Sequence, residues 1–123
     1  MKTLIKLFFL CFTISVCLIG KSISEDKIKI GLIVPLTGEY KEIGDSIVKS
    51  VIMAANKIDD DTIEIYIKDN SSRLRDTFLA AKELNEAGIK IVIGPIFQKN
   101  LKLLSNFSDM TFLSLTNKIE GNP

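Results

Sequence analysis

The sequence contains no histidine and no tryptophan, and its two cysteines, Cys11 and Cys17, both lie within the first 24 residues. The absence of histidine excludes Ser-His-Asp and Cys-His catalysis, and the cysteine positions exclude thiolate chemistry and ordinary zinc sites from the rest of the chain. No G-x-G-x-x-G or Walker A sequence is present, so nucleotide binding of those types is not supported. We therefore expect no enzyme activity, no catalytic residues, no metal site and no cofactor.

The first 24 residues have the pattern of a signal peptide. Lys2 and Lys6 supply positive charge, the run Leu7–Ile19 is almost wholly apolar, and Ser22 and Ser24 are small residues at the positions that a signal peptidase reads. The apolar run is shorter than the roughly 20 residues of a membrane span. We predict cleavage after Ser24 and export to the periplasm, with an uncleaved anchor as the alternative.

Cys17 raises the further alternative of a lipoprotein. An acylated cysteine usually follows a small residue, whereas Val16 stands here, so we expect no lipid. Cleavage after Ser24 removes three of the 16 basic residues and none of the 15 acidic ones, which leaves 13 basic residues and a net charge of −2. That charge does not suggest binding to nucleic acid or to an anionic membrane. Residues 25–123 suffice for one domain whose core needs no disulfide.

The remaining chain alternates strands and helices. Apolar periodicity predicts strands at Ile28–Val34, Ile63–Lys68, Ile89–Ile93 and Thr111–Leu115, with a helix in each of the three intervals. This order requires right-handed crossovers and a parallel sheet. Because the second strand alternates strictly between apolar and polar residues, we place it at an edge. The predicted fold is an α/β, flavodoxin-like parallel sheet of order 2-1-3-4, flanked by helices and cut short after its fourth strand.

Several local signals mark the ends of these elements. Asp45 or Ser46 is expected to cap the first helix, and Gly88 to end the second in a left-handed conformation. The segment Asp69–Ser72 supplies turn and cap residues before the second helix. Asp59–Asp61 is interpreted as a solvated turn and not as a cation site, because no spaced set of oxygen ligands completes a cage.

A set of short motifs recurs along the chain in a definite order. These motifs are Ile28–Leu36, Thr37-Gly38, Gly44-Asp45, Ile67–Asn70, Ala80–Leu84 and Gly88–Pro95. In order and spacing they resemble the start of the leucine/isoleucine/valine-binding type of periplasmic binding protein. The resemblance implies a protein of two α/β lobes that close on a small ligand, and it implies that residues 25–123 form an incomplete N-terminal lobe.

The sequence departs from the amino-acid binders of that family at three places. Ile43 stands where they typically have an aromatic residue, Phe97–Asn100 replaces a hydroxyl-rich turn, and Leu115–Lys118 replaces a Pro-Ala-Ala/Gly-Thr-like turn. Gly94–Phe97 and Leu113–Asn117 look more like the branch called penicillin-binding protein activators. That resemblance implies a protein that acts on cell-wall synthases through protein contact.

Three functions therefore remain open. The chain is an activator-type module that contacts a cell-wall synthase, a receptor that delivers an amino acid or similar solute to an ABC permease, or a truncated remnant that does neither. Ligands of open α/β sheets bind where loops follow the carboxyl ends of the strands. The candidate ligand-binding residues in those loops are Thr37, Gly38, Tyr40, Asn70, Gln98, Thr116 and Asn117.

Two properties follow from the missing part of the fold. We expect no useful affinity for leucine, isoleucine or valine, because half of the contacts of a two-lobed site are absent. We also expect residues 25–123 alone to be marginally stable at best, because the fourth strand would expose an apolar edge, including Phe112 and Leu113.

Overall fold

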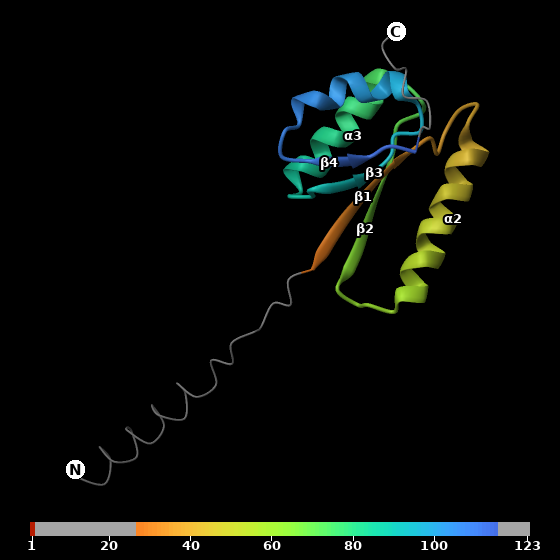
Figure 1. The fold of residues 1–123 in the computed structure, drawn as a ribbon. Coiled ribbons are helices and arrows are strands. Elements are labelled where there is room, and N and C mark those ends of the chain that lie inside the picture. Colours follow the sequence, from red (N-terminus) through yellow and green to blue (C-terminus); the bar gives the residue numbers. More distant parts are fainter. Residues whose placement is uncertain (2–26, 116–123) are drawn as a thin grey trace.

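The computed structural model describes Met1 and residues 27–115. Its elements follow in the order β1 (Ile28–Val34), α2 (Lys41–Ile58), β2 (Ile63–Asp69), α3 (Leu74–Glu86), β3 (Ile91–Ile93), the 3-10 helix η1 (Gln98–Asn106) and β4 (Thr111–Leu113). The strands form one parallel sheet of order β2-β1-β3-β4 (Figure 1). This confirms the predicted fold class and strand order. The predicted signal peptide and the tail beyond residue 115 lie outside the described residues.

The helices are divided unequally between the two faces of the sheet. Figure 1 shows α3 and η1 on one side of the sheet and α2 on the other. Right-handed crossovers produce this division, because the chain moves one way across the sheet to reach β2 and the opposite way to reach β3 and β4. The core lies on the α3 side, where Ile33, Leu84 and Val92 are fully buried.

The strands differ in burial as the sequence predicted. Leu32, Ile33 and Val34 in β1 are fully inaccessible to solvent, as expected for a central strand that is covered on both faces. No residue of β2 is fully buried, which agrees with its position at the edge. β1 pairs with β2 over seven residues but with β3 only over Ile30–Leu32.

The first helix begins earlier than predicted. Its N-cap is Tyr40, which makes no side-chain cap bond, so the prediction that Asp45 or Ser46 caps this helix was wrong. Asp45 instead forms an ion pair with Lys41 one turn away. The Ser46 hydroxyl donates to the backbone carbonyl of Glu42 at 2.9 Å. Both side chains therefore act within the helix and not at its end.

The early start of α2 depends on a close contact between its first turns and the end of β1. Gly44 is the one buried residue of α2, and a Cβ built on it would lie 1.8 Å from the carbonyl oxygen of Pro35. No side chain fits into that distance. Glycine at this position therefore lets the helix lie directly against the chain that leaves β1.

The second helix ends as predicted. Gly88 adopts a left-handed φ of 76°, and its N–H donates to the Asn85 carbonyl at 2.9 Å. The N–H of Ile89 donates to the Leu84 carbonyl at 3.0 Å, and the side chains of Leu84 and Ile89 are both fully buried. These contacts form a Schellman motif with its usual apolar pair.

The second half of the sheet is shorter than predicted. β3 and β4 each have three residues instead of five, and the segment between them is a 3-10 helix. Leu113 is 52 % exposed and Leu115 is 43 % exposed, so the apolar edge that we expected is present. Marginal stability of the isolated chain stays a prediction. Within residues 27–115, no helix is long and apolar enough to cross a membrane.

Candidate functional site

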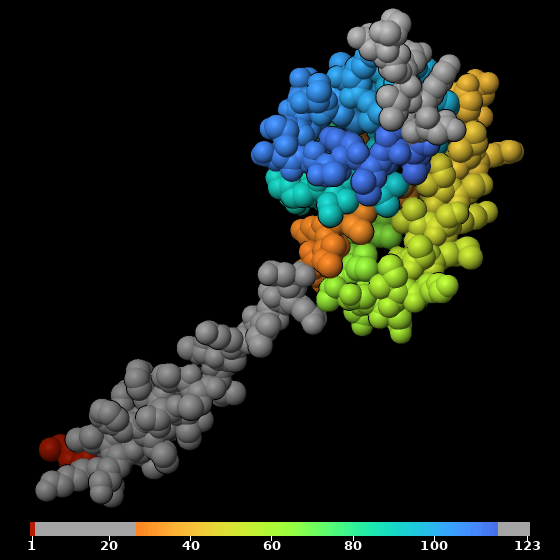
Figure 2. Space-filling view, in the orientation of Figure 1, coloured from red at the N-terminus to blue at the C-terminus, as the bar shows by residue number. Residues whose placement is uncertain are grey.

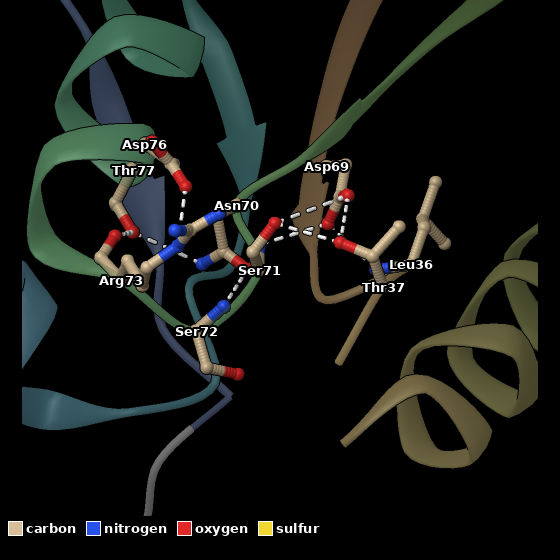
Figure 3. A network of polar contacts seen from close by, with 9 residues as sticks. All are labelled: Leu36, Thr37, Asp69, Asn70, Ser71, Ser72, Arg73, Asp76 and Thr77. Atoms are coloured by element: carbon tan, nitrogen blue, oxygen red, sulfur yellow. Dashed lines mark hydrogen bonds and ion pairs between the residues drawn. The ribbon is translucent and has the colours of Figure 1, made fainter. Parts of the chain in front are cut away.

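Asp69, at the end of β2, holds the loop after β1 against the turn after β2. Its Oδ1 accepts the backbone N–H groups of Leu36 and Ser71, each at 2.8 Å, and its Oδ2 accepts the Thr37 hydroxyl at 2.6 Å. The Ser71 hydroxyl lies 2.7 Å from that of Thr37 and donates to Asp69 Oδ2 at 3.3 Å (Figure 3). The hydroxyl groups of Thr37 and Ser71 are thus engaged with each other and with the carboxylate.

The same contacts set the charge of Asp69. Burial by itself raises the pKa of this carboxyl, but the hydrogen bonds from Thr37, Ser71 and Leu36 outweigh burial and hold the pKa below its ordinary value. Asp69 is therefore ionised at neutral pH. The sequence analysis treated it only as part of the turn Asp69–Ser72, because the polar residues of this segment indicate a turn but not a contact with the loop after β1.

Asn70 lies under this cluster and not on its surface. Its side chain is 1 % exposed, so our expectation that its polar group is open to a cleft was wrong. The Nδ2 group donates to Thr77 Oγ1 at 3.1 Å, and Oδ1 accepts the N–H of Ser72 at 3.2 Å. The Thr77 hydroxyl donates in turn to the Arg73 carbonyl at 2.8 Å (Figure 3). Asn70 therefore fixes the turn to the start of α3.

An aromatic pair joins the loop after β1 to the loop after β3. The ring centroids of Tyr40 and Phe97 are 4.7 Å apart, with an interplanar angle of 65°. This is an edge-to-face arrangement. The ammonium group of Lys99 lies 5.6 Å from the centroid of Phe97, and Gln98, which opens η1, is half-buried beside them. This part of the edge presents aromatic surface and a positive charge.

Asn100, in the first turn of η1, is a buried polar residue that the sequence analysis did not select. Its side chain is fully inaccessible, and neither Oδ1 nor Nδ2 has a hydrogen-bond partner among residues 27–115. Its backbone N–H donates to the Phe97 carbonyl at 3.0 Å. A buried amide without partners costs stability.

The structure gathers some of the predicted site residues and separates others. Thr37 and Tyr40 lie at the carboxyl edge of the sheet, and Gly38 between them has a φ of 83° and open space where a side chain would begin. Thr116 and Asn117 lie outside the described residues. The role of the seven candidates as ligand contacts stays a prediction. Within residues 27–115 no group of three or more potential ligating side chains could hold a metal ion.

The fold is that of a periplasmic binding protein lobe, as comparison with solved structures shows. LivJ of Streptococcus pneumoniae, a branched-chain amino acid transporter substrate-binding protein solved with isoleucine, has a TM-score of 0.68 and 22% identity. That match covers 77% of this chain and 30% of LivJ. A solute-binding protein of an ABC transporter from Rhodopseudomonas palustris, solved with 3,4-dihydroxy benzoic acid, has a TM-score of 0.63 and 26% identity. That match covers 68% of this chain and 24% of the solute-binding protein.

Full-length LpoA of Haemophilus influenzae is also similar in fold to this chain. Its TM-score is 0.62 at 26% identity, and the match covers 76% of this chain and 17% of LpoA. The chain thus spans less than a third of the length of each of these solved proteins. Comparison with curated proteins gave no match.

Residues 21–120, which make up most of the chain, match the family described as "LppC putative lipoprotein". The chain belongs to the LppC family. This description contradicts our expectation that the protein carries no lipid. That expectation rested on Val16 alone, and the residues that match the family begin at 21, after Cys17. Both residues lie outside the described part of the chain.

Proposed function

We propose that the protein is a non-enzymatic, extracytoplasmic module of the penicillin-binding protein activator type, which acts on a cell-wall synthase through protein contact. The observation that carries the proposal is membership of the LppC family together with 26% identity to LpoA. The matching C-domain of LpoA from Haemophilus influenzae is described as a regulator of PBP1A, and that match covers 73% of this chain.

The carboxyl edge of the sheet supports a protein partner better than an amino acid. An amino acid needs hydrogen-bond groups for its ammonium and carboxylate, but the hydroxyls of Thr37 and Ser71 are already engaged with Asp69. Asn70 is buried and satisfied. The edge also presents the half-buried rings of Tyr40 and Phe97 and the exposed Lys99, and aromatic residues are enriched at protein interfaces.

Membership of the LppC family also supports a proposal about where the protein is located in the cell. We propose that the protein is exported to the periplasm and held at a membrane by a lipid on Cys17. The support is the lipoprotein description of the family and the position of Cys17 at the end of an apolar segment.

A second candidate function is the substrate-binding component of an ABC transporter for amino acids or related solutes. The likeness in fold to LivJ and to the Rhodopseudomonas palustris protein favours it, since both were solved with a small molecule bound. In that case Thr37, Tyr40 and Gln98 would face the ligand, and an ABC permease would be the partner.

Binding of the exported protein to the PBP1A-type synthase of its own organism, measured by biolayer interferometry, tests the first proposal. Lys99→Glu reverses a charge at the carboxyl edge and should weaken binding several-fold. Lys90→Glu makes the same charge change just before β3, at the opposite edge, and should leave binding unchanged. Equal effects of the two variants, or no binding, would count against contact through this edge.

Isothermal titration with leucine, isoleucine and valine separates the two candidates. We expect no measurable binding, because each 1.4 kcal/mol of lost contact lowers affinity about tenfold. Micromolar binding of any of the three without binding to the synthase would favour the transport receptor. Loss of that binding in Thr37→Ala would then place the ligand at the predicted edge.

A further inference from the structure

Two exposed lysines lie on one line along η1. A 3-10 helix has 3.0 residues per turn, so side chains three positions apart project in the same direction. Leu101 and Leu104 lie on one such line and pack against the core, where Leu104 is only 3 % exposed. Lys99 and Lys102 lie on another line, and both are exposed. We call these two lysines the basic row, and Figure 2 shows η1, in blue, on the outer surface of the molecule above β4.

The charge of the basic row is not neutralised within residues 27–115. Neither Lys99 nor Lys102 forms an ion pair in this part of the chain, and η1 contains no acidic residue. Helix α2, by contrast, pairs Lys41 with Asp45 one turn further along. The dipole of a helix is positive at its N-terminus, so acidic residues and not lysines stabilise the first turns. The stability of η1 therefore does not explain the basic row.

The basic row lies in a part of the chain whose charge differs in sign from the part before it. Residues 27–87 contain nine basic and eleven acidic residues, whereas residues 88–115 contain three basic residues and one acidic residue, Asp109. The net charge is therefore −2 for the first part and +2 for the second. A protein with this asymmetry attracts an acidic partner at η1 and repels it elsewhere. We therefore expect a local contact with an acidic protein and not adsorption to an extended anionic surface such as a membrane.

The spacing of the basic row allows two carboxylates to bind at once. A rise of about 2.0 Å per residue places the Cα atoms of Lys99 and Lys102 about 6 Å apart along η1. Acidic side chains one turn apart on an α-helix have a similar spacing, since their Cβ atoms are about 5–6 Å apart. An acidic helix that lies along η1 can therefore offer one carboxylate to each ammonium group.

One of the two ammonium groups is already held in place by aromatic contacts. The Nζ of Lys99 lies 5.6 Å from the centroid of the Phe97 ring, which is within the range of a cation–π contact. Phe97 in turn packs edge-to-face on Tyr40, with the ring centroids 4.7 Å apart. A side chain that is ordered beforehand loses little freedom when a partner binds it. The basic row is therefore partly preorganised at the end where η1 leaves the carboxyl edge.

We infer that the basic row docks on an acidic α-helix of a partner protein, which presents two carboxylates one turn apart. The contact extends from the carboxyl edge, where η1 begins, along the exposed side of this helix. The identity of the partner as a cell-wall synthase rests on the proposed function, whereas the acidic helix is inferred from η1 itself. Exposed charge pairs of this kind mainly accelerate association and make its rate depend on salt.

Association kinetics with the PBP1A-type synthase of the same organism test this inference. Biolayer interferometry is carried out at about 50 and about 300 mM NaCl, because salt screens exposed charges. Lys102→Glu should lower the association rate constant at least fivefold at the lower salt concentration and reduce its dependence on salt. Lys102→Arg keeps the charge and should stay within twofold of wild type. Lys49→Glu makes the same charge change on the exposed side of α2 and should have no effect.

Two results of this experiment would overturn the inference. One is an association rate of Lys102→Glu equal to that of wild type, and the other is an equal loss in Lys49→Glu. If the wild-type protein does not bind the synthase at all, the proposed function fails, and a cross-linking experiment then decides the inference.

A photo-cross-linker next to the basic row identifies the partner in the organism's own cells. p-Benzoylphenylalanine replaces Ser105, which is exposed three positions after Lys102, and replaces the exposed Asn56 of α2 in the control. The cross-linked peptide is sequenced. A protein peptide with two acidic residues three or four positions apart, obtained from position 105 only, supports the inference even where it comes from a protein other than the synthase. A cross-link to lipid or to a peptide without such an acidic pair, or no cross-link, would overturn it.

Discussion

Replacement of Asp69 by asparagine tests whether charge holds the loop after β1 in place. The variant keeps the size of the side chain and one carbonyl oxygen, but it removes the negative charge and turns one acceptor into a donor. The N–H groups of Leu36 and Ser71 then bond to a neutral oxygen. The Thr37 hydroxyl donates to Oδ2 in the wild type, and it has to accept a hydrogen bond where the variant places its amide nitrogen.

The expected loss follows from the number of bonds. A hydrogen bond to a charged group contributes about 1.5–3 kcal/mol and a neutral one about 0.5–1.5 kcal/mol. In the variant, two backbone hydrogen bonds at 2.8 Å go to a neutral oxygen instead of a charged one. Because Asp69 is partly exposed, solvent screens part of this effect. We therefore expect Asp69→Asn to lower the free energy of unfolding by about 1–3 kcal/mol at pH 7.

The loss should depend on pH in a definite direction. The pKa of Asp69 is lower in the folded protein than in the unfolded chain, so its stabilisation is complete above the unfolded value near 3.9 and is lost as the pH falls through the folded pKa. Wild type and Asp69→Asn should therefore begin to converge as the pH falls below about 4. Urea unfolding followed by circular dichroism at pH 7, 5 and 3.5 measures this.

The exposed Asp45 provides the control, because its carboxylate pairs with Lys41 on the surface of α2. Asp45→Asn should change the free energy of unfolding by less than about 1 kcal/mol at pH 7. If the loss in Asp69→Asn is the same at all three pH values, or is absent at pH 7, the argument from charge fails.

Three further predictions concern single positions. Gly44→Ala should destabilise the protein by about 1–3 kcal/mol in urea unfolding, although alanine is the better helix former. The control Asn56→Ala, on the exposed side of α2, should stabilise the protein slightly. A Gly44→Ala variant more stable than wild type would contradict the close contact between Gly44 and the Pro35 carbonyl. Asn100→Leu should raise the free energy of unfolding by about 1 kcal/mol, and a fall would show that its amide has a partner. Intact mass of the exported protein should show a lipid on Cys17, while a chain cut after Ser24 without lipid would support the processing that the sequence predicted.

The sequence predicts the order of elements well because that order depends on periodicity within each segment. The apolar run that ends at Val34 and the alternation in Ile63–Lys68 distinguish a central strand from an edge strand without any tertiary information. Gly88 likewise ends α3 through its own conformational freedom. Local signals of this kind are sufficient for the topology.

The errors arise where a contact between two different elements decides the outcome. Asp45 is a good cap by its chemistry, but α2 begins a turn earlier, where Gly44 can lie against Pro35. Asn70 is a good surface residue by its polarity, but it is buried because Thr77 offers it a partner seven residues away. Neither partner can be recognised from the neighbouring residues alone.

The unequal lengths of the strands have a consequence for local opening. β1 and β2 share a seven-residue register, whereas the β1–β3 and β3–β4 ladders are three residues long. Hydrogen exchange reports segments that open at different free energies, and a short ladder at an edge opens more easily than a long one. Amide protons of β4 should therefore exchange through local fraying, whereas those of β1 should exchange only through global unfolding. The half of the sheet that contains β4 can adapt to what packs against it, and the half built on β1 and β2 stays fixed.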